Sequence, residues 1–592
     1  MWFALALVLP LLWATALATT QRGDGAWRRV TGLLIRGAPV ALVPAGVLAV
    51  LAPDPLTLDW LVRGTTLAVD VVSRALFLVA VLLYGAAVQA VTWRLEDRAA
   101  HLIAALLTCF VGNALVYLAH DTITFYLGFA LMSFGALWLV LHERSEKTAR
   151  AGRVYLALTV VSETAILAAL LLIDHAGARL VEEVPAAVAA SDQAGLIVGL
   201  LIAGFGVKAG LVPLHFWLPL AHPAAPPPAS AVLSGAMVKA GLIGWLRFLP
   251  LGEAEMPATG TVLTVLALFG AFAAVLVGAV QRDPKAVLAY STISQMGFLG
   301  AVVGVALARP DLAGACITAA LIYAVHHGLA KGALFLGVSV WKRHASPQTP
   351  GRRLVVVAGL VLASLAVVGS PLSAGSVGKY AAKEAIKGAT ILEVEPYDLL
   401  PWVATGSTLL LLRFAWILRG SDTEPTPERS ELTAWSVLVL TSVSVPWLLS
   451  GAWVPLSDVP GLDPVTLWDA TWPVLVGLAV GGLVWLLARR RDWSAGLWRD
   501  RLPVGDVVVP VEAASRGLGR AAGQVVAGVT SARDRVVEVG QGLGRRLEDG
   551  GSRVEAAEEA LGWRVSGLLI LVTILVLVAA AVAAGALGGR IG

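Results

Sequence analysis

Long apolar stretches make up most of this sequence, and short polar segments separate them. An α-helix needs about 20 consecutive apolar residues to cross the hydrocarbon core of a bilayer. The stretches that come close to this length are residues 2–19, 31–52, 69–92, 100–118, 121–142, 153–173, 193–219, 228–250, 258–280, 285–307, 312–339, 353–373, 398–418, 432–450, 472–488 and 563–587. The pattern predicts an all-α polytopic membrane protein with about 16 transmembrane helices.

The charges of the polar segments alternate along the chain. Basic residues gather after the first, third, fifth, ninth, eleventh, thirteenth and fifteenth stretches, for example at Arg144, Lys147 and residues 489–491. The other segments are acidic or neutral, as at Glu182 and Glu183. Because basic loops stay in the cytoplasm, we expect a multi-pass protein of a bacterial-type inner membrane with its N- and C-termini outside.

Residues 505–561 are too polar to cross a membrane. Apolar residues four apart recur every seven positions, beginning with Leu518 and Ala522, and charged residues fill the positions between them. A helix of this kind lies along a membrane surface with its apolar face buried. We therefore expect an amphipathic helix on the cytoplasmic side, followed by an anchoring span in 562–592. Its many glycines leave a flexible tether as the alternative.

Composition narrows the possible classes of function. Hydrophobic residues make up 57% of the chain and charged residues 14%, whereas soluble domains are about 25% charged. Cys109 and Cys316 lie in apolar stretches without metal-ligand spacing, which argues against a disulfide, an iron–sulfur cluster or a zinc site. The sequence also has no P-loop and no glycine-rich dinucleotide motif after a strand. We therefore predict no metal, no cofactor and no nucleic-acid partner.

Ionisable side chains inside the apolar stretches are the main chemical signal. A charge at mid-membrane costs about 2.5–3.5 kcal/mol, so each of these residues needs an explanation. They are Glu163, Lys208, Lys239, His326, His327, Lys331 and Lys379. His327 and Lys331 are four residues apart and share one helix face. Because burial weakens the hold of a lysine on its proton, a row of buried lysines and histidines predicts a proton relay.

Two of the stretches are interrupted by glycine and proline beside a lysine. Pro213 follows Lys208, and Pro371 precedes Lys379. Proline breaks the hydrogen bonding of a helix, and such a break survives in a membrane only where protein or a wet cavity surrounds it. A matched pair of broken helices is typical of an inverted-repeat transporter.

The expected parts of the chain follow from these patterns. They are N-terminal transmembrane helices in 1–99, a first inverted-repeat half-channel in 100–250, a second in 251–420, C-terminal transmembrane helices in 421–504, the amphipathic surface helix in 505–561 and the anchor helix in 562–592.

Simpler roles stay open for several of these residues. Lys239 or Glu163, taken alone, is equally well explained as a structural partner. His215 and His222 flank a loop and are typical of loop ends. Lys383 is expected to extend along its helix towards the membrane surface. Several separate cations inside the spans nevertheless favour a relay.

Four segments of the sequence resemble a known family in the same order. GVKAGLVPLHFWLPLAHPAAPPPASAVLSGAMVKAG is similar to the central motif of the antiporter-like subunits of respiratory complex I, Mrp-type cation/proton antiporters and membrane-bound hydrogenases. The other three segments resemble its tenth-span motif, its eleventh-span His/Lys motif and its broken twelfth span. They read QRDPKAVLAYSTISQMGFLG, HHGLAKGALFLGV and GSPLSAGSVGKY. The resemblance runs at least over residues 102–383.

This resemblance implies two proton half-channels joined by a polar axis at mid-membrane. In that scheme Lys208 is the central lysine of the first half, and Lys239 is a relay lysine on the next span. His327 and Lys331 connect the two halves, and Lys379 is the exit lysine.

The sequence departs from the family pattern at three positions. Ala130 occupies the place of a glutamate that usually pairs with the seventh-span lysine, and Glu163 is the candidate replacement. Tyr323 stands where some members have a second eleventh-span histidine, and Ser234 stands where the eighth span often has a histidine. The further candidate relay or partner residues are Glu163, His215, Tyr323 and His326.

The sequence therefore predicts proton translocation by one subunit of a larger complex. The chain shows no catalytic or redox centre of its own, so a partner must supply the energy. We expect other membrane subunits, a soluble or peripheral energising subunit and the lipid bilayer as partners. A proton-conducting partner of an inorganic-carbon uptake complex is the alternative, followed by Na⁺/H⁺ exchange and a structural scaffold. Because Glu163 is almost alone as a membrane carboxylate, protons are favoured over sodium.

Overall fold

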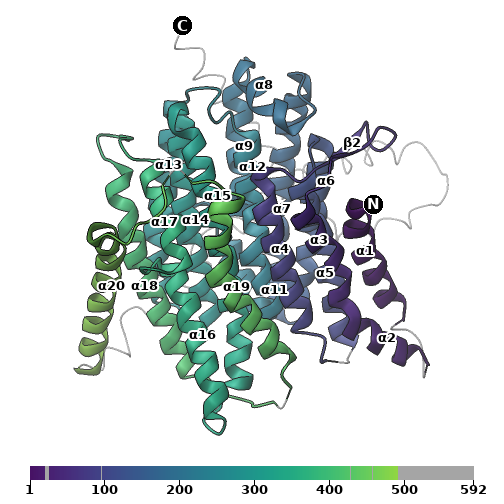
Figure 1. The fold of residues 1–592 in the computed structure, drawn as a ribbon, viewed down its shortest axis with the longest axis vertical. Coiled ribbons are helices and arrows are strands. Elements are labelled where there is room, and N and C mark those ends of the chain that lie inside the picture. Colours follow the sequence, from purple (N-terminus) through teal and green to yellow (C-terminus); the bar gives the residue numbers. More distant parts are fainter. Residues whose placement is uncertain (21–25, 95–96, 427, 457, 491–592) are drawn as a thin grey trace, which may run out of the picture. The chain divides into compact units, whose positions relative to one another are not determined.

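The computed structural model describes residues 1–20, 26–94, 97–426, 428–456 and 458–490, which form a helical bundle and a short two-stranded hairpin (Figure 1). The helices expected in 505–561 and 563–587 lie outside the described residues. The first elements are α1 (Trp2–Thr20), α2 (Ala26–Gly37), η1 (Ala38–Leu42), α3 (Val43–Leu51), β1 (Leu56–Leu58), β2 (Thr65–Leu67), α4 (Val71–Gln89), α5 (Asp97–Leu118), α6 (Thr122–Leu141), α7 (Glu146–His175), η2 (Val181–Glu183) and α8 (Val184–Ala190). The central elements are α9 (Ala194–Ala209), α10 (Trp217–Ala224), α11 (Pro227–Val232), η3 (Leu233–Met237), α12 (Val238–Phe248), α13 (Pro257–Ala279), α14 (Pro284–Ala308), η4 (Pro310–Leu312) and α15 (Ala313–His344). The last elements are α16 (Pro350–Val368), α17 (Ala374–Ala385), α18 (Pro396–Arg419), α19 (Ser430–Ala452) and α20 (Pro464–Arg490).

The structure confirms an all-α polytopic membrane protein. Fourteen helices of the described part are long and apolar enough to cross a membrane, so the expected number of 16 is not confirmed. Of the two remaining stretches, 563–587 lies outside the described residues. The other, 193–219, contains the shorter α9, which has 16 residues.

The stretch 193–219 is a broken helix, as its glycine and proline predict. Helix α9 ends at Ala209, and Gly210 adopts the left-handed conformation with φ 77°. Glycine takes this conformation without steric strain, which makes it the usual residue after a helix end. Pro213 lies in the turn that follows, and α10 resumes the helical direction at Trp217.

The stretch 353–373 ends in a second break of the same design. Helix α16 ends at Val368, Gly369 takes φ 82°, and α17 begins at Ala374. Pro371 lies in the turn between the two helices. Each half of the chain thus contains one glycine-terminated half-helix followed by a short continuation.

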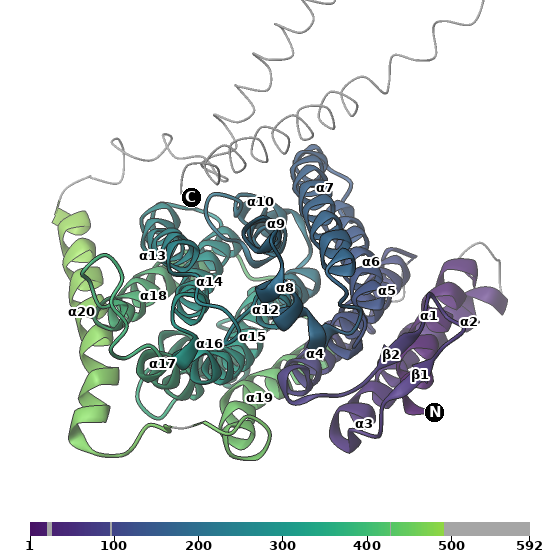
Figure 2. The same ribbon diagram turned by 90° about the horizontal axis from the view of Figure 1, so that it is seen from above.

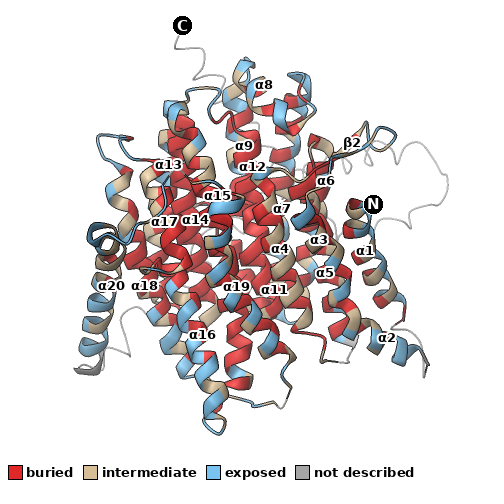
Figure 3. Cartoon of the chain, in the orientation of Figure 1, coloured by how far each residue is buried: buried red, intermediate tan, exposed pale blue. Residues whose placement is uncertain are grey.

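The most deeply buried helices lie at the centre of the bundle (Figure 3). In Pro227–Phe248 and in Pro284–Ala308, every residue of the most apolar 18-residue segment is buried. In the corresponding segment of Pro464–Leu487, only 11% of the residues are buried. The view from above shows α14 and α15 enclosed by neighbouring helices, with α20 at one edge and α1 to α3 at the other (Figure 2). Polar residues on the central helices therefore face protein instead of lipid.

Two arginines each tie a helix to a carbonyl just beyond the end of an earlier helix. On α12, Arg247 Nη1 donates to the carbonyl of Ala119, directly after the end of α5, at 2.8 Å. On α18, Arg413 donates through Nε and Nη2 to the carbonyl of Gln281, just after the end of α13, at 3.0 and 2.9 Å. In both places an arginine thus satisfies a carbonyl that the end of an earlier helix leaves without a helical partner.

Arg247 is also part of a buried ion pair. Its Nη2 lies 2.6 Å from Asp70 Oδ2, and its side chain is only 4% exposed. Asp70 caps α4 by accepting from the backbone N–H of Ser73 at 2.7 Å. Burial raises the pKa of the Asp70 carboxyl, but the charge of Arg247 and the bonds from Ser73 outweigh burial and hold that pKa below its usual value. Asp70 is therefore ionised at neutral pH and joins α4 to α12.

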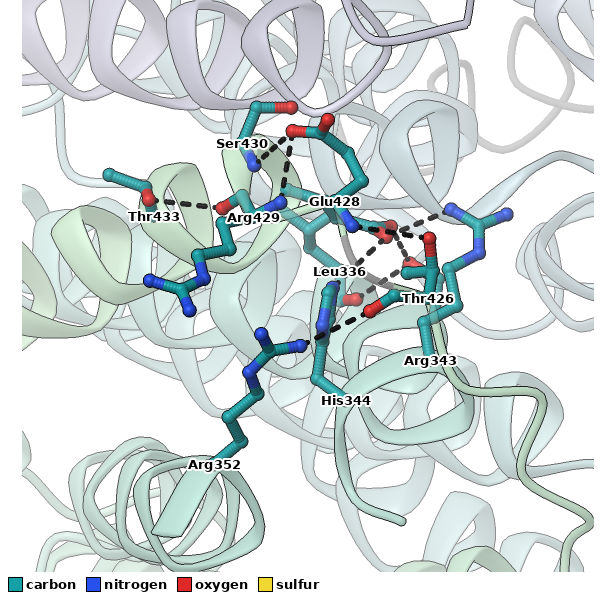
Figure 4. A network of polar contacts seen from close by, with 11 residues as sticks. Leu336, Arg343, His344, Arg352, Thr426, Glu428, Arg429, Ser430 and Thr433 are labelled. Atoms are coloured by element: carbon teal, nitrogen blue, oxygen red, sulfur yellow. Dashed lines mark hydrogen bonds and ion pairs between the residues drawn. The ribbon is translucent and has the colours of Figure 1, made fainter. Parts of the chain in front are cut away.

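A second polar network joins the end of α15 to the start of α19. Glu431 is buried, and it accepts from Ser339 Oγ at 2.6 Å and from Arg343 Nη1 at 2.8 Å. Figure 4 shows the adjoining loop, where Arg352 of α16 donates to the carbonyl of Thr426 at 3.2 Å. The helix that follows the second repeat is thus tied to the central helix α15 by charge as well as by packing.

Replacing Arg247 by leucine should lower the stability of the folded protein. It leaves Asp70 without its main partner, and breaking a buried ion pair costs about 3–5 kcal/mol. We expect a clearly lower midpoint of thermal unfolding for the detergent-solubilised protein. The matched control is Arg179→Leu, whose ion pair with Asp174 is exposed and therefore worth at most about 1 kcal/mol. Equal midpoints for the two variants would contradict the role of Arg247.

Candidate functional site

Lys208 lies two residues before the first helix break and is almost fully buried, with 2% of its surface exposed. Its Nζ donates to Tyr155 Oη of α7 at 2.9 Å, and that hydroxyl donates to the carbonyl of Ser133 of α6 at 2.8 Å. The ring centres of Tyr155, Trp217 and Phe129 lie 5.1, 5.7 and 5.9 Å from Nζ. Aromatic faces at these distances stabilise a cation. The site therefore holds Lys208 by a phenol and an aromatic cage.

Trp217 connects this cage to the helix break. Its Nε1 donates to the carbonyl of Val207 at 2.7 Å, one of the last carbonyls of α9, which lack their regular helical partners. The Trp217 ring also packs edge-on against Tyr155, with ring centres 5.2 Å apart. The Trp217 side chain thus donates a hydrogen bond to the broken helix end and also forms one wall of the site around Lys208.

Glu163 lies on α7 within electrostatic range of Lys208 and is 5% exposed. The two do not form a direct ion pair. Among the described residues, no basic side chain contacts the carboxylate of Glu163, and Ser133 is its polar neighbour. An ionised carboxylate is costly to bury without partners, which makes Glu163 a candidate proton-binding group. Its role in place of the glutamate that Ala130 replaces stays a prediction.

Lys239 lies two residues after the end of the π-helical segment η3. Its Nζ donates to the carbonyl of Ser234 at 2.7 Å, and Tyr117 Oη of α5 donates to the carbonyl of Ala236 at 3.2 Å. Single π-helical turns inside longer helices occur frequently at functional sites. Here the segment provides backbone oxygens for two side chains, one of which is a predicted relay lysine.

A line of polar side chains continues from η3 across α14. Ser234 Oγ lies 2.8 Å from Thr292 Oγ1. Gln295 accepts from Tyr323 Oη at 2.6 Å and donates to Ser407 Oγ of α18 at 2.8 Å. Thr292 and Gln295 are three residues apart and share a face of α14. Sequence analysis named Tyr323 but missed Gln295, although polar residues at helical spacing in an otherwise apolar stretch were the available signal.

Helix α15 carries the adjacent residues His326 and His327 and, one turn later, Lys331. All three are completely buried. Lys331 Nζ donates to the carbonyl of Leu288 at 3.3 Å. Within the described part of the chain, both ring nitrogens of His327 lack a hydrogen-bond partner, whereas His326 interacts with the backbone of Ile322 one helical turn earlier. The ring of Tyr323 lies 4.6 Å from that of His326. The ring nitrogens of His327 are therefore available to bind a proton or a water molecule.

His222 is the functional candidate that sequence analysis underestimated. A loop-end role predicts exposure, but the structure buries His222 completely on α10. Its ring stacks on Phe335 of α15 at 4.3 Å, and in the described residues both of its nitrogens lack a partner. The charges of Lys285, Lys331 and Lys239 act on it. The helix break brings it inward, and no local sequence signal reveals this.

Lys379 lies on α17 and completes the second break. Its Nζ donates to the carbonyl of Val368, the last residue of α16, at 2.7 Å. A Cβ atom on Gly369 would lie only 2.5 Å from Lys379 Cδ, so the turn accepts the lysine stem closely. Lys379 thus satisfies the end of the broken helix, as Trp217 does in the first half. Unlike Lys208, it is only partly buried.

The structure gathers most of the predicted relay residues but not all of them. Electrostatic interactions connect Lys239, Lys331 and Lys379 with His326 and His327. The charged neighbour of Lys208 is Glu163 instead. The candidates therefore form two groups, Lys208 with Glu163 near the first helix break, and Lys239, Lys331 and Lys379 with the two histidines of α15.

The helices that carry the two groups are nevertheless in direct contact. A Cβ atom on Gly241 of α12 would lie 2.6 Å from the carbonyl oxygen of Phe205 and 2.7 Å from the backbone nitrogen of Ala209. Gly241 is two residues from Lys239, and Ala209 follows Lys208. Only a residue without a side chain allows this approach of α9 and α12.

The remaining candidates lie in the turns. His215 is buried between α9 and α10, close to Pro213, and its ring lies 6.5 Å from that of Phe216. Within the described ranges, no group of three or more His, Cys, Asp or Glu residues could hold a metal ion. The predicted chemistry of the site thus rests on lysines, histidines and neutral oxygens.

Comparisons with known proteins place the chain among antiporter-like membrane subunits. The family model described as NADH:quinone oxidoreductase/Mrp antiporter, TM matches residues 119–382. The chain is 30% identical over 396 residues to NADH-quinone oxidoreductase subunit N 1 of Streptomyces griseus, covering 63% of this chain and 80% of that relative. It is also 31% identical over 258 residues to Hydrogenase-4 component B of Escherichia coli, covering 41% of this chain and 38% of that relative.

A solved structure shows the same fold. The Mrp complex from Dietzia sp. DQ12-45-1b matches with a TM-score of 0.72 at 21% sequence identity, covering 96% of this chain and 65% of that chain. Because the chain spans less than half the length of the matched hydrogenase component, its activity and partners are matters for proposal.

Replacing Gly378 by alanine should disturb the second group of the site. A Cβ atom there would lie 2.6 Å from His326 Nδ1 and 2.7 Å from Tyr323 Cα. Overpacking of this kind costs about 1–3 kcal/mol and should push α17, with Lys379, away from α15. We expect a lower midpoint of thermal unfolding. The control is Gly314→Ala on α15, where a Cβ meets nothing within 4 Å. If both variants unfold like the unmodified protein, the close contact is wrong.

Proposed function

The chain belongs to the family of NADH:quinone oxidoreductase and Mrp antiporter membrane subunits, and we propose that it moves protons across the membrane through its buried lysines and histidines as one subunit of a larger complex. The observation that carries this proposal is the group of completely buried nitrogens on the central helices. His222 and His327 lack hydrogen-bond partners in the described part of the chain, and both are within electrostatic range of Lys239 and Lys331.

The partners of the four lysines support proton transfer over a structural role. Each ammonium donates to a neutral oxygen, from the Tyr155 hydroxyl or from a backbone carbonyl. A buried carboxylate in contact would hold the lysine proton firmly, because an opposite charge favours the charged form. A neutral oxygen accepts a hydrogen bond from both the ammonium and the neutral amine. Such lysines can give up and regain a proton without losing their position.

The chemistry of the site favours protons over sodium. Sodium, like other hard cations, is bound by clustered oxygen ligands, whereas lysine has only donors when it is charged. In the described residues the unpaired carboxylate near these lysines is Glu163. A single carboxylate does not form such a cluster of oxygen ligands. Protons are therefore the main proposal, and Na⁺/H⁺ exchange is the alternative.

The energy for transport is expected to come from partner subunits. We infer that redox-driven or antiporter complexes with further membrane subunits are the setting, since relatives are named as hydrogenase and NADH-quinone oxidoreductase components. A proton-conducting partner of an inorganic-carbon uptake complex is the alternative. Basic segments such as 342–353 are expected on the cytoplasmic side.

Substituting Lys208 by alanine should nearly abolish proton transport while the protein still inserts and assembles. The loss of a positioned proton-transfer group lowers a rate by about 100-fold. Transport is measured with a pH-sensitive dye in membrane vesicles that contain the native assembly. Lys387→Ala is the control, because Lys387 is exposed and pairs with Glu384 at the surface. Unimpaired transport in Lys208→Ala would remove Lys208 from the relay.

Tyr155→Phe should slow transport by about tenfold, because a hydrogen bond to a charged group is worth about 1.5–3 kcal/mol. The substitution keeps the ring beside Lys208 and removes only the hydroxyl that accepts from Nζ. The same vesicle assay applies. Tyr84→Phe on α4 is the control for the loss of a tyrosine hydroxyl, because the Tyr84 hydroxyl has no hydrogen-bond partner in the described residues. Equal rates in the two variants would show that the Tyr155 hydroxyl does not support Lys208.

A further inference from the structure

A cavity of about 60 Å³ lies beside Lys379, between α17, α18 and α20. Lys379, Lys383, Thr466 and Asp469 are among the residues that line it. A water molecule needs about 10–15 Å³ of such space, so the cavity has room for several. Thr466 and Asp469 are partly exposed, which brings the cavity to the protein surface. The cavity also explains why Lys379 is only partly buried, whereas Lys208 is 2% exposed.

An ion pair stands in this cavity between Lys379 and the surface. Lys383 Nζ lies 2.8 Å from Asp469 Oδ2 of α20, and the side chains are 15% and 38% exposed. Lys383 Nζ also lies 4.3 Å from the centre of the Tyr397 ring. Lys383 therefore contacts Asp469 of α20 and Tyr397 of α18. From the sequence it was expected to extend along its helix towards the membrane surface.

The two lysines of the cavity share one face of α17. They are four residues apart, and side chains at this spacing are neighbours on a helix. Both side chains line the same cavity, so a proton that leaves Lys379 through it passes Lys383. In the folded chain Asp469 compensates the charge of Lys383.

We propose that Asp469 on α20, by neutralising Lys383, keeps the cavity beside Lys379 open to the positive charge that Lys379 passes on. This inference rests on the proposed function, because it requires Lys379 to carry a transported proton. Asp469 acts through Lys383 and is a positioning residue.

The physical reason is repulsion between like charges in a narrow space. Without Asp469, the Lys383 ammonium would face the cavity uncompensated, in surroundings that screen charge less than bulk water. A proton that enters the cavity would then meet a positive charge before it reaches the surface. The helix α20, which follows the two repeats, thereby contributes to transport instead of only packing against them.

The first experiment compares three variants in membrane vesicles that contain the native assembly, with proton flux measured by a pH-sensitive dye. Asp469→Asn should lower the flux about tenfold, and Asp469→Glu should preserve it. The double variant with Asp469→Asn and Lys383→Gln should recover most of the flux, because both charges are then absent. A purely structural ion pair would not be rescued in this way, since the double variant has no ion pair.

Two results would overturn the inference. One is normal flux in Asp469→Asn, and the other is a double variant as slow as Asp469→Asn alone. Lys379→Ala separates this failure from that of the proposed function. If Lys379→Ala abolishes flux while the Asp469 variants behave normally, the relay stands and the exit route is wrong. If Lys379→Ala has normal flux, the proposed role of Lys379 itself fails.

A second experiment tests access to the cavity with a single reactive thiol. Both native cysteines are buried, so Thr466→Cys adds one accessible thiol in the cavity wall. A cationic methanethiosulfonate should then block flux, and a neutral reagent of equal size should block it less. Val465→Cys is the control. Val465 is next to Thr466 in the chain, but it is 72% exposed and is not part of the cavity wall. Flux that persists after complete labelling of Thr466→Cys would exclude the cavity as the route.

Discussion

A helix that breaks inside a membrane leaves peptide groups that neither water nor the next helical turn can satisfy, and the candidate site is built around the repair of two such breaks. At the first break the indole of Trp217 donates to the carbonyl of Val207. At the second, Lys379 itself donates to the carbonyl of Val368. An amine donates in both its charged and neutral forms, so Lys379 can keep the broken helix satisfied while it changes protonation. Structural repair and proposed transport thus meet in one side chain.

The charges of the protein fall into two classes with different partners. Near the helix ends, arginines are paired with carboxylates, as in Arg247 with Asp70 and Arg343 with Glu431. Inside the spans, Lys239 and Lys331 donate to backbone carbonyls. The first class fixes the helices relative to one another, because a buried ion pair is costly to separate. The second class leaves each lysine proton exchangeable. The Lys383–Asp469 pair stands between these classes, at the surface end of the cavity beside Lys379.

Much of the fold was accessible from the sequence because the bilayer imposes a simple rule on it. Apolar stretches of membrane length predicted the helices, and glycine and proline beside Lys208 and Lys379 predicted the two broken spans. The number of spans was less certain, since a stretch such as 193–219 has the composition of a span although its helix ends at Ala209. Composition measures how apolar a stretch is, whereas the helix end depends on the left-handed turn at Gly210.

The sequence by itself determined the membrane class, the two broken helices and the ionisable residues that the spans carry, because insertion into lipid selects for apolar length and makes each buried charge conspicuous. Only the tertiary structure decided which of these residues meet. It placed His222 against Phe335 in the interior, separated Lys208 from the group around Lys331, and brought Asp469 of α20 to Lys383. These relations depend on packing between helices far apart in the chain, such as the approach of α9 to α12 at Gly241, which no local pattern encodes.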